Sequence, residues 1–164
     1  MYALLTMRNP CNPDADPPRG IGGWLILPAL GLVISPLWIA YVLVTRHLPL
    51  FLDGRWARLA TVGTHTYHPL LACEVVFEVV GNLTGLTLAT VTLVFFLKRS
   101  RRAPMLMVAL LSWGVVFSVT NHFFVNALSA GSPSWADAFR PIVAAAIWIP
   151  YFLESRRVKA TFVR

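Results

Sequence analysis

Six polar side chains interrupt the long apolar stretches of this chain, and their types are those that bind ions or exchange protons. They are Glu74, Glu78, Asn82, His122, Asn126 and Arg140. Charged groups are costly within a bilayer and often mark ion or proton pathways. Glu74, Glu78 and Asn82 recur every four residues, so a helix places them on one face. Pairing Arg140 with Glu74 or Glu78, beside His122 and Asn126, would offset much of the cost. The pattern predicts either a structural ion pair or a proton-exchanging polar pocket.

His65 and His68 are weaker candidates, for a metal site completed by the two glutamates. Histidine and carboxylate suit zinc or iron, but the H-x-x-H spacing lies in an irregular segment and is not diagnostic. We favour a helix start at Tyr67, His68 and Pro69, because aromatic residues prefer the membrane interface and proline suits a first helical turn. The sequence also contains no G-x-S-x-G, P-loop, H-E-x-x-H or C-x-x-C motif. We therefore predict no metal, no cofactor and a non-enzymatic protein.

The composition identifies the environment that these residues occupy. The chain has 164 residues, of which 57% are apolar and 13% are charged, whereas soluble domains carry roughly 25% charged residues. This excludes a disordered chain and an ordinary cytosolic enzyme, and two cysteines, Cys11 and Cys73, do not make a disulfide framework. The net charge of +7 comes from short basic runs between apolar blocks. Such runs favour membrane orientation over nucleic-acid binding.

A membrane-spanning helix needs about 20 residues, and the apolar pattern predicts four of them. The spans are about 23–45, 70–97, 104–128 and 136–154. The fourth is the weakest, because only 141–153 is uncharged and the span must take Arg140 into the membrane. We predict an irregular tail over 1–19, an interfacial loop over 46–69, and an all-α, four-helix transmembrane bundle over 20–164.

The basic residues predict the orientation of these spans. Ten Lys and Arg lie on the side that holds both termini, against three in the 46–69 loop. The positive-inside rule then places both termini in the cytoplasm and, in a bacterium, the loop in the periplasm. The predicted cytoplasmic basic anchors are Lys98, Arg99, Arg101, Arg102, Arg156, Arg157 and Lys159.

Three segments together resemble a known family. They are GIGGWLILPALGLVISP at 20–36, YHPLLACEVVFEVVGN at 67–82 and IWIPYFLESRRVKATF at 147–162. They are similar to the YdgK-like family of bacterial inner-membrane proteins, also called domain of unknown function 2569, and the resemblance covers 20–164. Glu78 and Asn82 match the family pattern, whereas Glu74 is not part of it. The resemblance implies a four-helix protein of the bacterial inner membrane and supplies no established activity.

Three functions compete on this sequence. The first is a non-enzymatic accessory or scaffold subunit of a membrane complex, which the small size and the close-packing Gly81-x-x-x-Gly85 favour. The second is a small proton-coupled transporter that uses the Glu/Arg/His cluster. The third is a membrane enzyme or lipid-binding protein with a periplasm-facing polar pocket. In each case the partners are the lipid bilayer and either another membrane protein or a second copy of the chain, with no nucleic acid.

Overall fold

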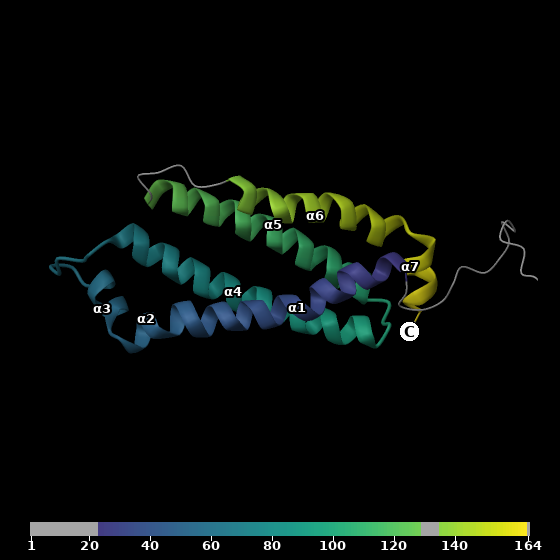
Figure 1. The fold of residues 1–164 in the computed structure, drawn as a ribbon, viewed down its shortest axis with the longest axis horizontal. Coiled ribbons are helices and arrows are strands. Elements are labelled where there is room, and N and C mark those ends of the chain that lie inside the picture. Colours follow the sequence, from purple (N-terminus) through teal and green to yellow (C-terminus); the bar gives the residue numbers. More distant parts are fainter. Residues whose placement is uncertain (1–22, 129–134, 164) are drawn as a thin grey trace, which may run out of the picture.

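The computed structural model describes residues 23–128 and 135–163, and within these ranges every regular element is a helix (Figure 1). The all-α prediction is therefore confirmed for this part of the chain. The predicted tail, 1–19, lies outside the described residues.

The first span is longer than predicted. A 3₁₀ turn, η1 (Gly23–Leu25), leads into α1 (Ile26–Val42), a π-helical stretch, η2 (Leu43–His47), and α2 (Leu48–Leu52). Together they form one apolar segment of 30 residues. The predicted end at residue 45 was too early, because proline is tolerated in the first helical turn of α2 and the segment after Arg46 is again apolar. A left-handed turn at Gly54, with φ of 67°, then separates α2 from α3 (Arg55–Ala60).

The next two spans begin and end close to their predicted limits. These are α4 (Pro69–Leu97) and α5 (Ala103–Leu128), which rise about 43 and 39 Å at 1.5 Å per residue. Both exceed the roughly 30 Å of a bilayer's hydrocarbon core. His68 caps α4, since its Nδ1 accepts the backbone N–H of Leu71 at 3.2 Å. This confirms the interpretation of residues 67–69 as a helix start.

The last long helix, α6 (Trp135–Glu154), occupies the fourth predicted span and is followed by the short α7 (Arg156–Thr161). Among the described residues, three segments are long and apolar enough to cross a membrane: Gly23–Leu52, Pro69–Leu97 and Ala103–Leu128. These are the helices of a membrane protein. α6 is not among these three segments.

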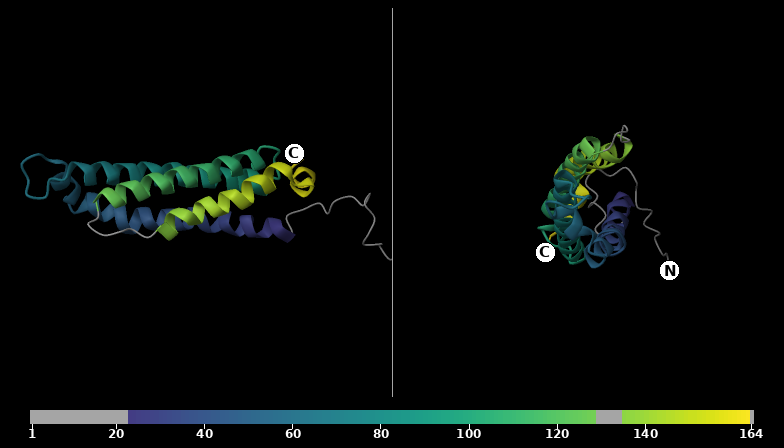
Figure 2. Two further views of the ribbon diagram at one scale, coloured as in Figure 1. Left: turned by 90° about the horizontal axis from the view of Figure 1, so that it is seen from above. Right: turned by 90° about the vertical axis from the view of Figure 1, so that its left-hand side faces the viewer.

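Helices that are consecutive in the sequence pack side by side: α1 against α4, α4 against α5, and α5 against α6. The end view in Figure 2 shows that they form an open arc, with α1 and α6 at its two edges. All of them meet at one end, where a single buried cluster joins η1, α1, α4, α5, α6 and α7. Its members are Leu25, Leu32, Phe96, Ala103, Met107, Phe152, Val158 and Phe162.

Glycines allow the close approach of α4 to its neighbours. A Cβ at Gly81 would overlap the ring of Phe117 on α5, and one at Gly85 would lie 3.7 Å from Ile39 on α1. Both glycines are buried, whereas a Cβ at Gly31 would meet nothing within 4 Å. The close packing predicted from Gly81-x-x-x-Gly85 is therefore confirmed. Four threonines of α4 bond back to their own helix: Thr84, Thr87, Thr90 and Thr92 each donate to the carbonyl four residues earlier.

Gly81→Ala should destabilise the α4–α5 contact, because the added methyl group forces the Phe117 ring to move. Overpacking of this kind typically costs about 1–3 kcal/mol. We expect a lower free energy of unfolding in detergent, measured by far-UV circular dichroism. Gly31→Ala is the matched control, since its methyl group enters open space and adds helix propensity. Equal stability of the two variants would contradict the described packing.

Candidate functional site

The clearest chemical feature of the structure is a contact between a buried histidine and a glutamate of the next span. Nε2 of His47 lies 3.1 Å from Oε2 of Glu78 on α4, and only 6% of His47 is exposed. His47 ends η2, and its Nδ1 lies 3.4 Å from the carbonyl oxygen of Val42, five residues earlier. π-helical turns are rare and are frequent at functional sites. In this chain, the π-helical turn η2 places His47 against α4.

The two ring nitrogens of His47 both face oxygen atoms, and this limits the protonation states that satisfy them. A carbonyl oxygen accepts and cannot donate. A ring that donates to both Val42 and Glu78 carries two N–H groups and a positive charge, so its contact with Glu78 is an ion pair. A ring with one proton donates to only one of them. The site therefore has two alternative hydrogen-bonding patterns that differ by one proton.

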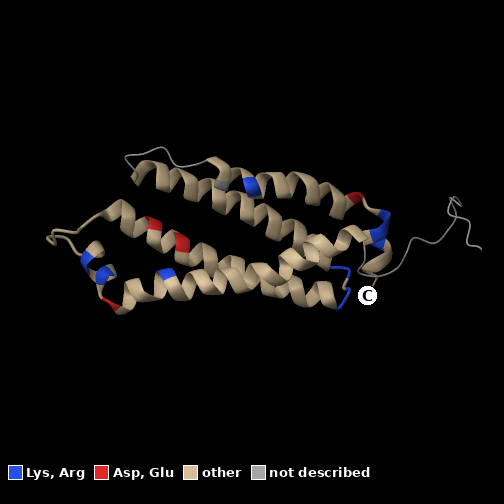
Figure 3. Cartoon of the chain, viewed as in Figure 1, with Lys and Arg blue, Asp and Glu red and all other residues tan. Residues whose placement is uncertain are grey.

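A second carboxylate lies beside this pair. Glu74 is one helical turn before Glu78, is 8% exposed, and interacts electrostatically with both Glu78 and His47. One turn after Glu78, the amide of Asn82 donates to the Glu78 backbone carbonyl at 2.8 Å. Figure 3 shows the two acidic positions close together on α4. We call His47, Glu74 and Glu78 the titratable cluster.

The remaining members of the predicted polar set lie on the other two long helices. His122 of α5 is 8% exposed, and its ring centroid lies 3.9 Å from that of Trp135 on α6. The side chains of Asn126 and Arg140 are exposed. The structure thus gives Glu78 the partner His47, and it places His122 against α6. Of the six residues, three lie on α4, which packs against the first span: Glu74, Glu78 and Asn82. The other three lie on α5 and α6, which pack against each other: His122, Asn126 and Arg140.

His47 was not among the predicted site residues. Because the first span was predicted to end two residues earlier, Arg46 and His47 were assigned to the loop. The signal that could have found it is the apolar sequence Leu48-Pro49-Leu50, which continues the span beyond the two basic residues.

The weaker metal candidates lie apart from this cluster. His65 is exposed in the segment before α4, and His68 is occupied as the helix cap. In the residues described, no three or more His, Cys, Asp or Glu side chains group so as to hold a metal ion.

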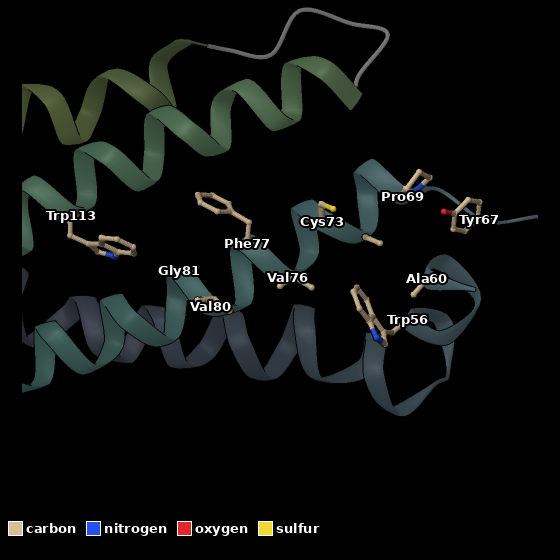
Figure 4. A pocket seen from close by; sticks show the side chains of 11 residues that line it. Trp56, Ala60, Tyr67, Pro69, Cys73, Val76, Phe77, Val80, Gly81 and Trp113 are labelled. Carbon is tan, nitrogen blue, oxygen red and sulfur yellow. The ribbon is translucent and has the colours of Figure 1, made fainter. Parts of the chain in front are cut away.

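Two hollows flank α4 on its other sides. One lies between α3, the start of α4, and α5; it has a volume of about 660 Å³, and its lining includes Trp56, Tyr67, Phe77 and Trp113 (Figure 4). The other lies between the edge helices α1 and α6, with α4 and α5 behind it, and measures about 420 Å³. We call it the arc groove. Gly31, Asn82, Gly114 and Ala144 are among the residues that line it.

The predicted basic anchors gather at the opposite end of the arc from the titratable cluster (Figure 3). Four of them fall at 98–102, between α4 and α5, and three lie on α7. The guanidinium of Arg157 packs against Gly23 at the start of the first span. Nε of Arg101 donates to the carbonyl of Val163 at 3.0 Å. The two basic segments therefore contact the first and the last of the residues that the structure describes.

The fold and the site define a class: a membrane protein that is helical throughout its described elements, with a contact between a buried histidine and a partly exposed glutamate of its first two spans. The family described as Protein of unknown function (DUF2569) matches residues 18–163, and the chain belongs to this family. No curated protein and no solved structure matches it.

The contact between His47 and Glu78 should appear as energetic coupling. The variants His47→Gln and Glu78→Gln each remove one partner, so the double variant should lose less than the sum of the two. Groups in contact typically couple by about 0.5–3 kcal/mol. The measurement is a double-mutant cycle of unfolding free energies in detergent.

Glu78→Gln combined with His122→Gln is the matched control, since His122 packs against α6. Its two effects should add within about 0.5 kcal/mol. Additive effects for the His47 cycle would mean that the contact does not hold the first span to α4.

Proposed function

We propose that this chain is a non-enzymatic accessory or scaffold subunit of a bacterial inner-membrane complex, and that its arc groove receives a transmembrane helix of a partner. The observation that supports this most is the open edge between α1 and α6. Each edge helix packs mainly against one neighbouring long helix. A partner helix laid between them would complete the array.

The lining of the arc groove suits a helix better than it suits a polar substrate. Gly31 and Gly114 leave open space at their Cβ positions, and small residues let helix backbones approach closely in lipid. Ser35 bonds back to the Gly31 carbonyl at 2.6 Å and so adds little free polarity. Asn82 uses one of its hydrogen-bonding sites on its own helix, and an amide has further sites that suit an interhelical hydrogen bond.

The groove proposal predicts that bulk at Gly31 or Gly114 prevents partner binding without unfolding the chain. Gly31→Leu and Gly114→Leu should abolish stoichiometric co-purification from gently solubilised membranes, while abundance stays normal. Thr87→Leu is the matched control, because Thr87 is exposed on α4 and is not among the groove-lining residues.

Retention of the partner by both glycine variants would refute the groove as its binding site. A second candidate, a proton-coupled carrier, is favoured by the burial of His47 and Glu74 and by the contact of His47 with the partly exposed Glu78. Proton flux by the isolated protein in liposomes, lost in Glu78→Gln, would support the carrier in place of the scaffold.

The proposal includes a topology with both termini in the cytoplasm and α6 as a fourth span. α6 has 20 residues and rises about 30 Å, which equals the thickness of the hydrocarbon core. The seven basic anchors at 98–102 and on α7 lie at one end of the helices, as the positive-inside rule requires of a cytoplasmic face. Residues 46–69 then face the periplasm.

Cysteine labelling tests this topology. In a background with Cys11 and Cys73 replaced by Ser, Thr64→Cys should react with a membrane-impermeant maleimide in intact cells. Ser100→Cys should react only after the cells are opened. Labelling of position 100 in intact cells would contradict this topology, because the basic anchors would then face the periplasm.

A further inference from the structure

A third cavity lies at the basic end of the arc, where α5 begins and α6 ends. It measures about 700 Å³, and its walls combine two cations with apolar side chains. Arg101 and Lys159 supply the charge, whereas Met105, Val108 and Leu153 are among the apolar residues.

The two cations come from different parts of the chain, and Arg101 is held by a hydrogen bond. Nε of Arg101 donates to the Val163 carbonyl at 3.0 Å, and this bond uses one of the five N–H donors of the guanidinium. Lys159 is exposed on α7, whose Val158 and Thr161 are buried. Val158 and Lys159 both line the cavity, so α7 contributes one apolar and one charged side chain to its walls.

The charge around this cavity favours an anion. Seven Lys and Arg lie at 98–102 and 156–159, and Glu154 is the one acidic residue in the described segments 98–128 and 150–163. Lysine and arginine bind phosphate oxygens through strong, charge-assisted hydrogen bonds.

The order of polarity along the cavity is that of a lipid. Arg101 precedes α5, Met105 lies in the first turn of this helix, and Val108 lies about 8 Å along the helix from its first residue, Ala103. The charge thus lies at the level of the headgroups, and the apolar walls extend into the level of the acyl chains. A soluble anion would use the charge and leave the apolar walls unoccupied.

We propose that this cavity binds one anionic phospholipid, with its phosphate between Arg101 and Lys159 and an acyl chain along Met105, Val108 and Leu153. Basic pockets between helices on the cytoplasmic side suit such headgroups. The proposal rests on the chain being inserted in a membrane and is independent of the scaffold role.

The test is a native mass spectrometry titration of the full-length protein in detergent, with phosphatidylglycerol and phosphatidylethanolamine of equal chain length. We expect one phosphatidylglycerol to bind about tenfold or more tightly than the zwitterionic lipid. Both lipids carry a phosphate, but the ammonium group of phosphatidylethanolamine is repelled by the cations of the cavity, and phosphatidylglycerol has no such group. Excess inorganic phosphate should not displace it, because a free anion lacks the acyl chain. Equal binding of the two lipids, or displacement by phosphate alone, would overturn the proposal.

Two kinds of variant locate the site. Arg101→Gln with Lys159→Gln should weaken phosphatidylglycerol binding about tenfold or more, and Lys159→Gln alone should weaken it in the same direction while leaving the Arg101 bond to Val163 in place. Val108→Trp should block the acyl-chain path without changing charge. The matched control, Lys98→Gln with Arg156→Gln, removes two exposed cations from the same two segments outside the cavity. An equal loss of phosphatidylglycerol affinity in the control would show diffuse electrostatic attraction and contradict the proposal. Unchanged affinity in Val108→Trp would contradict the acyl-chain site and so the proposal as well.

Discussion

Lipid tails are as apolar as leucine, so helices in a membrane associate through close packing and not through the hydrophobic effect. In this chain, all the long helices pack closely together at one end only. There Leu25, Phe96, Met107 and Phe152 bring the four helices and α7 into a single buried cluster. Away from it, α1 contacts α4, α4 contacts α5, and α5 contacts α6. The open arc and its groove both follow from this one-ended packing.

The two ends of the arc are held together by different kinds of contact. At the clustered end, Arg157 packs against Gly23 and Arg101 binds the Val163 carbonyl, so basic residues close the chain on itself. At the far end, local contacts hold pairs of helices instead: His47 with Glu78 for the first two spans, and His122 with Trp135 for α5 and α6. Removing one partner of such a contact leaves the buried His47 without its carboxylate, which is destabilising. The contact therefore helps to hold the first span against α4.

Much of the fold could be predicted from the sequence, because length and apolar composition are sufficient to place spans. The starts of α4 and α5 followed from proline chemistry and from the basic run between them, and the Gly81-x-x-x-Gly85 spacing indicated close packing. The open arc could not be predicted, since lipid-facing residues such as Leu37 and Trp38 are as apolar as the packed ones, and periodicity then does not mark the inner face. His47 was missed because Arg46 was taken as the end of the span. His47, the partner of Glu78, lies in the helical turn that the predicted span left out.

The central claim is that the helices pack fully at one end and leave the groove between α1 and α6 open to lipid. Nitroxide labels in a reconstituted, cysteine-free background test it through collisions with oxygen, which is concentrated among the acyl chains. A label at Gly31, which lines the groove, should be nearly as accessible as one at the exposed Thr87, and far more accessible than one at the fully buried Ala89. A label at Gly31 that is as protected as the one at Ala89 would show a closed bundle and contradict the account.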